Sequence, residues 1–222
     1  MTHVEVNGLF VAYRDVGEGP PLVLLHGFLS DSRCWGAQLA GLSDNFRVLA
    51  WDAPGAGSSS DPPETFTTAD RARCLARFLD VVGIERPGVL GLSWGGILAQ
   101  PFYGLYPDRV LALILCDTYA GWKGSLPEVA CNKRLERCLL ESLLPAGEFV
   151  PRWVPEFFTE SASDDLKGEM SARPACPWPG TLAPIQVAYA VSETSLAVAS
   201  GVLGARDTHR ILHKSHIRQT DC

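Results

Sequence analysis

Short apolar stretches recur through the first half of the sequence, each separated from the next by a segment with helical spacing. The stretches read as buried strands because their apolar residues are consecutive: residues 22–26, Arg47–Trp51, Gly88–Leu92 and 110–116. The intervening segments place apolar residues on one helical face: residues 31–42, 67–82 and 94–106. Strands that alternate with helices predict an α/β fold, with a mostly parallel, doubly wound sheet and helices on both faces.

The alternating region is preceded by a hairpin signal. Residues 4–6 and Leu9–Val16 flank the pair Asn7-Gly8, which favours a tight turn between two antiparallel strands. Thr67 and Thr68 are suitable N-terminal caps for the helix predicted up to Val82. The sheet is therefore expected to begin with an antiparallel pair and to continue with parallel strands.

The composition and the apolar pattern of the sequence change twice after Thr118. Residues 128–144 predict an amphipathic helix, and the stretch after them is rich in proline and aromatic residues. From Ser171 the chain becomes rich in proline and then polar, with residues 185–191 as a candidate strand.

We therefore expect three parts in the chain. Residues 1–118 form the core, residues 119–170 a small helical lid over the sheet, and residues 171–222 an atypical C-terminal segment. This last part is either a remnant of the final core strands or a segment in which those strands are degenerate or missing. A truncated or frame-shifted chain would have the same texture.

Charge and composition exclude several classes of partner. The formal net charge is −6, from 19 Lys and Arg against 25 Asp and Glu, and no basic cluster stands out, so neither nucleic acid nor an anionic membrane is expected as a partner. No apolar run reaches the roughly 18 residues that span a bilayer. The N-terminus lacks the basic start and apolar core of a signal peptide, so a cytoplasmic protein is expected. The seven cysteines include no close pair suited to a metal site, and no metal is expected.

The segment from Gly91 to Gly95 contains the candidate nucleophile. It reads G-x-S-x-G, follows an apolar strand and opens a helix, which is the strand–turn–helix setting that this motif requires. The turn forces Ser93 into a strained backbone conformation, and the flanking glycines avoid a collision where strand and helix approach. The Ser93 hydroxyl is therefore predicted to project at the carboxyl edge of the sheet. There the N-terminus of the helix favours a developing negative charge.

Two further segments precede this motif in a fixed order. His26-Gly27-Phe28 directly follows an apolar strand, and residues 51–58 read WDAPGAGS after the next strand. With the segment at Ser93 they resemble the α/β-hydrolase fold family over residues 3 to about 125. The branch that the motifs resemble most contains enol-lactonases, carboxylesterases and cofactor-free haloperoxidases. Epoxide hydrolases and haloalkane dehalogenases of the same family carry aspartate where this chain has Ser93.

The resemblance implies roles for the residues around Ser93. The backbone N–H groups of Phe28 and Trp94 would form an oxyanion hole, and His26 and Gly27 would shape the active-site loop. His26 lies too early in the family's Ser, acid, His order to be the general base. The segment at residues 51–58 is interpreted as a tight loop under the site, because it matches neither G-x-G-x-x-G nor a P-loop.

The acid and the base of a triad remain open between several residues. Asp117 follows the strand at 110–116, where some family members place their acid, and Glu193 follows the candidate strand at 185–191. Three C-terminal histidines are candidates for the base: His209, His213 and His216. His216 occupies the family's place best if Ile211 and Leu212 are a remnant of the eighth strand.

These observations predict a serine hydrolase that acts on ester, lactone or related acyl bonds through an acyl-enzyme at Ser93 and needs no cofactor. Residues 119–122 and 153–158 are aromatic enough to line a pocket for a small or medium apolar substrate. The alternative is a non-catalytic binding protein with a hydrolase-like fold, or an inactive truncated relative. The two hypotheses differ in whether a base reaches Ser93.

Overall fold

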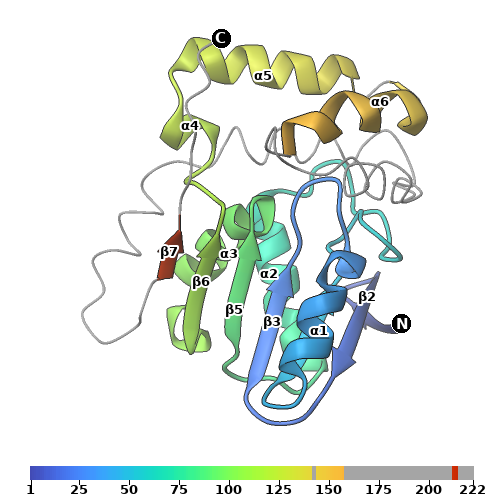
Figure 1. Cartoon of the computed structure of the whole chain (residues 1–222), viewed down its shortest axis with the longest axis vertical. Coiled ribbons are helices and arrows are strands. Elements are labelled where there is room, and N and C mark those ends of the chain that lie inside the picture. Colours follow the sequence, from blue (N-terminus) through green and yellow to red (C-terminus); the bar gives the residue numbers. More distant parts are fainter. Residues whose placement is uncertain (142–143, 158–211, 215–222) are drawn as a thin grey trace.

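The computed structural model describes residues 1–141, 144–157 and 212–214, and it contains one sheet with helices around it (Figure 1). Seven strands of these residues form the sheet in the order β1-β2-β4-β3-β5-β6-β7. The strands are β1 (Thr2–Val6), β2 (Leu9–Val16), β3 (Pro21–Leu25), β4 (Arg47–Trp51), β5 (Gly88–Leu92), β6 (Ala112–Cys116) and β7 (Leu212–Lys214).

The sheet begins with the predicted hairpin. Strands β1 and β2 pair antiparallel, with Val6 opposite Leu9. The turn between them needs positive φ at both central residues, and Asn7 and Gly8 adopt φ values of 51° and 82°. Strand β2 also pairs antiparallel with β4, and every following pair in the sheet is parallel. The expected mostly parallel α/β sheet is confirmed.

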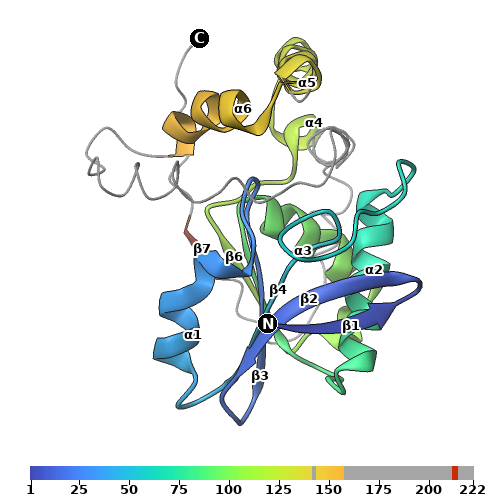
Figure 2. The ribbon, with the colours of Figure 1, turned by 90° about the vertical axis from the view of Figure 1, so that its right-hand side faces the viewer.

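Helices cover both faces of the sheet, as a doubly wound fold requires (Figure 2). Helix α1 (Gly36–Leu42) lies on one face, whereas α2 (Thr68–Val81) and α3 (Trp94–Leu105) lie on the other. Alternate residues of β3 separate accordingly. Leu22 and Leu24 join the cluster under α1, and Val23 and Leu25 join the larger cluster under α2 and α3.

The N-terminus of α2 has the cap that the sequence predicts. The Asp70 N–H donates to Thr67 Oγ1 at 3.1 Å, and the Thr67 N–H donates to Asp70 Oδ2 at 3.0 Å. This reciprocal pair is a capping box, which satisfies two backbone donors that the first helical turn would otherwise leave without partners. Helix α2 therefore begins at a fixed residue.

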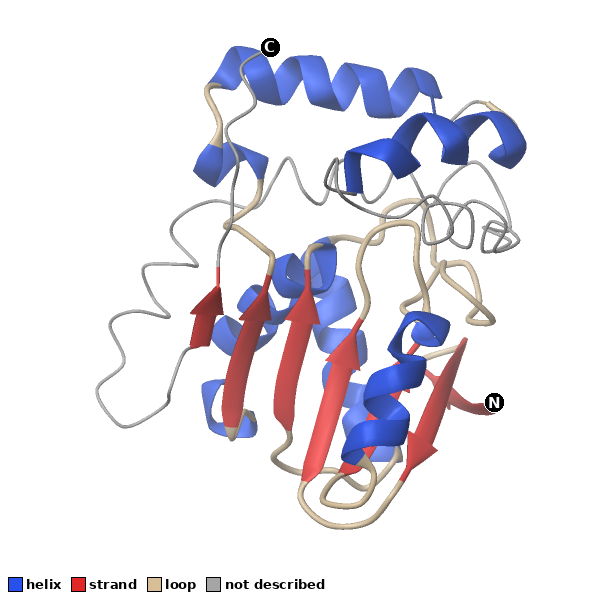
Figure 3. Cartoon of the chain, in the orientation of Figure 1, coloured by secondary structure: helices blue, strands red, loops and turns tan. Residues whose placement is uncertain are grey.

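Helices beyond β6 stand over the carboxyl edge of the sheet (Figures 1 and 3). They are α4 (Trp122–Ser125), α5 (Glu128–Glu141), α6 (Ala146–Trp153) and a 3₁₀ turn at Val154–Phe157. Helix α6 was not predicted, because its Pro151 is a residue that normally breaks a helix. The boundaries 1–118, 119–170 and 171–222 stay a prediction.

The C-terminal segment contributes strand β7 to the described sheet. It pairs parallel with β6, with His213 opposite Leu115 and Lys214 opposite Cys116. Leu212 thus belongs to a strand, and this strand is the neighbour of β6 in the described sheet. The candidate strand at 185–191 lies outside the described residues. In the part of the chain that the structure covers, no helix has the length and apolarity to span a membrane.

Candidate active site

Ser93 lies at the turn between β5 and α3. Strand β5 ends at Leu92 and the helix begins at Trp94, so Ser93 alone makes the reversal. Its backbone angles are φ 51° and ψ −115°, in a region that residues with a side chain rarely adopt. The Ser93 N–H donates to the carbonyl of Cys116 at 2.9 Å, which ties the turn to the end of β6. The sequence thus places its candidate nucleophile on a strained turn at the carboxyl edge of the sheet.

Glycines on both sides of Ser93 permit this turn. A Cβ atom on Gly91 would lie 2.5 Å from the carbonyl oxygen of Gly95, and one on Gly95 would lie 2.2 Å from the carbonyl oxygen of Leu25. Both contacts are with backbone atoms, which cannot rotate away. The first turn of α3 therefore packs directly against the ends of β3 and β5, at a separation that only glycine allows.

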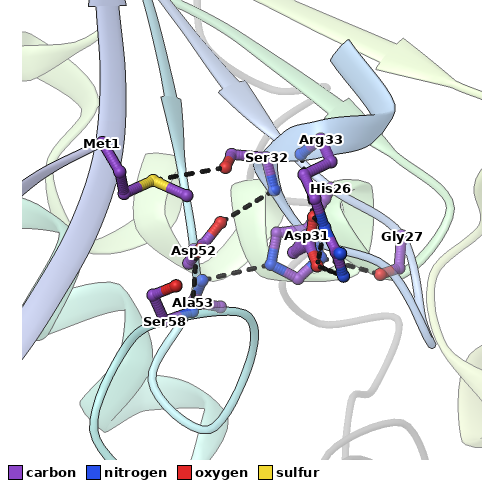
Figure 4. Close-up of polar contacts among 9 residues, drawn as sticks. All are labelled: Met1, His26, Gly27, Asp31, Ser32, Arg33, Asp52, Ala53 and Ser58. Carbon is purple, nitrogen blue, oxygen red and sulfur yellow. Dashed lines mark hydrogen bonds and ion pairs between the residues drawn. The ribbon is translucent and has the colours of Figure 1, made fainter. Parts of the chain in front are cut away.

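The loop after β3 is held by His26, which is buried beneath the site (Figure 4). Its Nδ1 lies 2.8 Å from the carbonyl oxygen of Gly27, and the Ala53 N–H donates to its Nε2 at 3.1 Å. A carbonyl accepts and an N–H donates, so the proton sits on Nδ1 and the ring is neutral. Both nitrogens are used in fixing the loop, so His26 has no nitrogen left to take a proton from Ser93.

The electrostatics of this position favour the neutral ring. Burial lowers the pKa of His26 below its ordinary value, and the hydrogen bond to Gly27 and the charges of Asp52 and Asp31 oppose that effect only in part. A positive charge at this position would also break the bond from the Ala53 N–H. The neutral His26 side chain therefore connects the loop after β3 to the loop after β4 by hydrogen bonds.

The loop after β4 is organised by the buried carboxylate of Asp52 (Figure 4). The Ser32 N–H donates to Asp52 Oδ1 at 2.8 Å, and the Ser58 N–H donates to Oδ2 at 2.8 Å. A Cβ atom on Gly57 would lie 2.0 Å from Oδ2, so glycine is needed for the loop to close around the carboxylate. The carboxylate therefore binds backbone N–H groups on both sides of it and holds this loop closed.

The two candidate oxyanion donors lie on segments that meet beside Ser93. Trp94 is the first residue of α3, so its N–H has no acceptor within the helix. On the other segment, a Cβ atom built on Gly27 would lie 3.6 Å from the Cβ of Ser93. Phe28 follows Gly27 directly. The end of β3 and the start of α3 thus bring both N–H groups to the region around the serine.

Helix α6 of the lid packs on Phe28. The Phe28 ring lies edge-on to Trp153 and Phe149, with centroid distances of 5.8 Å and 6.4 Å. The guanidinium of Arg137, on α5, lies 4.4 Å from the ring centroid of Trp153 and forms ion pairs with Glu141 and Glu156. Helix α6 therefore presents an aromatic surface to Phe28.

The acid and base candidates are only partly covered by the structure. Asp117 follows β6 with a φ of 45°, and its side chain is exposed. Its backbone lies next to Cys116, which accepts from the Ser93 N–H. His213 is in β7, beside β6. The remaining candidates lie outside the described residues: Glu193, His209 and His216.

Two residues near the site were missed by the sequence analysis. Arg71 is 1% exposed, with its guanidinium 6.0 Å from the ring centroid of Trp94, and burial lowers its pKa to about 10. Its position four residues before Leu75, on the apolar face of α2, was a signal that could have found it. Thr118, which contacts Ser93, carries no comparable local signal.

The described residues contain no cluster of side chains suited to bind a metal ion. Among residues 1–141, 144–157 and 212–214, no three His, Cys, Asp or Glu side chains lie close enough together to hold a metal ion.

Comparison with known proteins agrees with this geometry. The sequence model of the alpha/beta hydrolase fold family matches residues 20–134. The chain belongs to this family. The match extends from the start of β3 into α5, so it includes Ser93, the loop after β3 and the loop after β4.

Relatives within the α/β-hydrolase family differ in the reactions that their names describe. The chain is 36% identical over 114 residues to mouse bifunctional epoxide hydrolase 2, which covers 50% of this chain and 21% of the relative. It is 36% identical over 101 residues to a poly(3-hydroxyalkanoate) depolymerase of Ectopseudomonas oleovorans, covering 46% of this chain and 36% of the relative. The chain thus spans well under half of the length of these curated relatives.

A solved structure extends the similarity to most of the chain. A thermophilic esterase from Thermogutta terrifontis superposes with a TM-score of 0.78 at 28% sequence identity, covering 88% of this chain and 74% of the esterase. The family and this neighbour support a hydrolase, and they leave open which bond is cleaved.

The substitution Gly95→Ala tests the close approach under Ser93. The added Cβ would lie 2.2 Å from the Leu25 carbonyl oxygen, so we expect a loss of about 1–3 kcal/mol in the free energy of unfolding. Denaturant unfolding measures this loss.

The matched control is Gly41→Ala, which adds the same atom to a helix where nothing lies within 4 Å. We expect it to be neutral or stabilising by up to about 1 kcal/mol. Equal free energies of unfolding for Gly95→Ala and the wild type would contradict the contact.

His26 should make the protein less stable in mild acid. The pKa of His26 is lower in the folded state than in the unfolded chain. Its contribution to the free energy of unfolding is therefore complete above the ordinary pKa of about 6.5 and decreases as the pH falls toward the folded value. In this pH range His26 binds a proton in the unfolded chain but not in the folded chain. In His26→Gln, the free energy of unfolding should fall less steeply between about pH 7 and pH 5 than in the wild type.

The control for this measurement is His3→Gln, which removes an exposed histidine from β1. It should keep the wild-type slope of the free energy of unfolding against pH. If the slope of His26→Gln also equals that of the wild type, His26 is not the group responsible.

Proposed function

We propose that this chain hydrolyses an ester, lactone or related acyl bond through an acyl-enzyme on Ser93. The observation that carries the proposal is the backbone of Ser93, which has a φ of 51° and a ψ of −115° between β5 and the first turn of α3. Such a turn exposes the hydroxyl and brings the N-terminus of a helix to the reacting group. A serine held there by backbone strain serves nucleophilic attack better than it serves packing.

The reaction follows from the groups around this serine. Ser93 Oγ attacks the acyl carbon, its proton passes to a histidine base, and the N–H groups of Phe28 and Trp94 stabilise the resulting oxyanion. The tetrahedral intermediate then expels the alcohol oxygen, which takes the proton from the histidine and leaves the acyl group on Ser93. A water molecule, deprotonated by the same base, hydrolyses the acyl-enzyme and regenerates the serine.

The residue at the turn favours acyl transfer over epoxide opening. Mouse bifunctional epoxide hydrolase 2 is a relative of this chain, but enzymes of that kind in the family use an aspartate at this turn. An aspartate forms an ester with the opened epoxide, and water then cleaves that ester at the carboxyl carbon. An alkyl ether on Ser93 would have no such carbon, so the enzyme would stay alkylated after one turnover.

For the base we propose His216, with Asp117 or Glu193 as the orienting acid. Strand β7 ends at Lys214, which pairs with Cys116, and Asp117 is the next residue after Cys116. Parallel strands present their carboxyl ends at one edge of a sheet, which is the edge where Ser93 lies. His216 follows Lys214 by two positions in the sequence. His209 and His213 are the alternatives for the base.

The surroundings of Phe28 support a small or medium apolar acyl group as the substrate. The rings of Phe28, Phe149 and Trp153 lie in mutual contact where α6 packs on the loop after β3, and Trp122 is also buried at the start of α4. Apolar and aromatic walls with a few polar groups are typical of sites for such ligands. Cleavage of the acyl bond requires no cofactor in this mechanism.

Active-site labelling tests the nucleophile. We expect a fluorophosphonate probe to label the wild-type chain and not the Ser93→Ala variant. The same substitution should lower the turnover of a short-chain nitrophenyl ester by a factor of about 10³ or more. The control is Ser125→Ala, which changes an exposed serine at the end of α4. A folded wild-type chain that is neither labelled nor active would favour the non-catalytic binding protein.

Substitution of the C-terminal histidines tests the base. Among His209→Ala, His213→Ala and His216→Ala, we expect only the last to lower kcat by about 10³ or more, because removal of the base of a triad costs this much. Circular dichroism of each variant checks that it is folded. Full activity in all three variants would place the base elsewhere.

A further inference from the structure

Thr118 makes a contact with the nucleophile turn that the proposed mechanism has not used. It follows Asp117 after β6, and it is one of the few polar residues that are buried, with 5% of its surface exposed. Its Oγ1 donates a hydrogen bond of 2.6 Å to the carbonyl oxygen of Ser93. The same carbonyl accepts from the N–H groups of Gly96 at 2.9 Å and Ile97 at 3.2 Å, which are bonds of the helix itself. The Thr118 hydroxyl is thus a donor that reaches this carbonyl from a different element.

The carbonyl of Ser93 belongs to the same peptide unit as the N–H of Trp94. A trans peptide is planar, so its C=O and N–H point in opposite directions and cannot turn independently. A hydrogen bond that fixes the Ser93 carbonyl therefore fixes the direction of the Trp94 N–H as well. That N–H is one of the two donors to which the proposed function assigns the oxyanion.

The position of Thr118 is itself secured by close packing. A Cβ atom on Gly96 would lie 2.5 to 2.6 Å from the side-chain atoms of Thr118, so the helix and the loop are in contact at a distance that only glycine allows. Gln100 Nε2 donates to the carbonyl oxygen of Tyr119 at 2.9 Å, and the Ser93 N–H donates to that of Cys116 at 2.9 Å. The loop at 116–119 is therefore attached to the turn on one side of Thr118 and to helix α3 on the other.

The bond also polarises the peptide unit. A donor on a carbonyl oxygen strengthens the N–H of the same unit as a donor, because hydrogen bonds in a chain reinforce one another. The surroundings are shielded from water, which makes this effect larger than it would be at an exposed site. Orientation and polarisation both act on the Trp94 N–H, and both matter most when a full negative charge develops next to it.

We propose that Thr118 is a positioning residue for the oxyanion hole, acting through the Ser93–Trp94 peptide unit. The proposal rests on the proposed function, because it assigns Thr118 a part in acyl transfer at Ser93. Since the charge on the substrate oxygen appears in the transition state and not in the bound ester, loss of the hydroxyl should lower kcat and leave KM unchanged.

Kinetics of Thr118→Val and Thr118→Ser test this role in the full chain. Valine keeps the shape and removes the donor, so we expect kcat for a short-chain nitrophenyl ester to fall about fivefold, the effect of one ordinary hydrogen bond. Inhibition by a trifluoromethyl ketone, which forms an oxyanion on Ser93, should weaken by the same factor. Thr118→Ser keeps the donor and should retain the wild-type kcat and the wild-type inhibition.

A second pair of variants covers the case in which valine disturbs the packing against Gly96. Thr118→Ser and Thr118→Ala both lack the methyl group and differ only in the hydroxyl. The alanine variant should show the fall in kcat and the serine variant should not. Equal kcat values in this pair, in chains that circular dichroism finds folded, would overturn the proposal.

A spectroscopic readout separates this inference from the proposed function. Ser93-Trp94 is the one Ser-Trp pair in the sequence, so ¹³C-carbonyl serine with ¹⁵N tryptophan marks this peptide unit alone in a nuclear magnetic resonance spectrum. Without the Thr118 hydroxyl, the Ser93 carbonyl carbon and the Trp94 amide proton should both shift upfield, whereas Thr118→Ser should retain the wild-type shifts. Unchanged shifts in Thr118→Val and Thr118→Ala would overturn the proposal whatever the activity.

Failure of the proposed function has a different signature. A wild-type chain that the fluorophosphonate does not label and that does not cleave the ester would refute acyl transfer, and a role of Thr118 in it, even if the shifts move. Normal labelling and turnover with an unchanged kcat in Thr118→Val would refute the role of Thr118 alone.

Discussion

The approach of α3 to the ends of β3 and β5 is the contact on which the rest of the site depends. Gly95 lies so close to the Leu25 carbonyl, and Gly91 so close to Gly95, that no Cβ atom fits at either position. This separation forces the reversal at Ser93 and exposes the first N–H of the helix at the same edge. The strain of the Ser93 backbone is borne by the packed sheet and helix around it.

Buried polar groups give the loops around Ser93 their fixed shapes. His26 joins the loop after β3 to the one after β4, and the Asp52 carboxylate accepts from backbone N–H groups of both loops. A buried polar group without a partner is costly, so each of these side chains admits few arrangements of its loop. Thr118 extends the same principle to the end of β6 by donating to the Ser93 carbonyl. The loops around Ser93 are therefore held in place by hydrogen bonds within the protein itself.

Helix α6 meets the loop after β3 through aromatic contacts. Phe28 carries a candidate oxyanion donor on its backbone, while its ring packs against Phe149 and Trp153 of α6. Arg137 links α5 to α6 by lying over Trp153 and pairing with acidic residues on both sides. Phe28 thus connects the loop after β3 to α6. In the proposed function, its backbone would hold the oxyanion and its ring would line the apolar wall, which would link substrate choice to the geometry of the donor.

The sequence by itself determined the hairpin at Asn7-Gly8, the alternation that gives the parallel sheet, and the turn at Ser93. Each of these depends on residues close together in the chain, where propensity and sterics act locally. Only the tertiary structure decided that Thr118 meets the Ser93 carbonyl, that Arg71 is buried under Trp94, and that α6 forms despite Pro151. Those contacts depend on which elements pack together, because the burial of apolar surface overrides local preference.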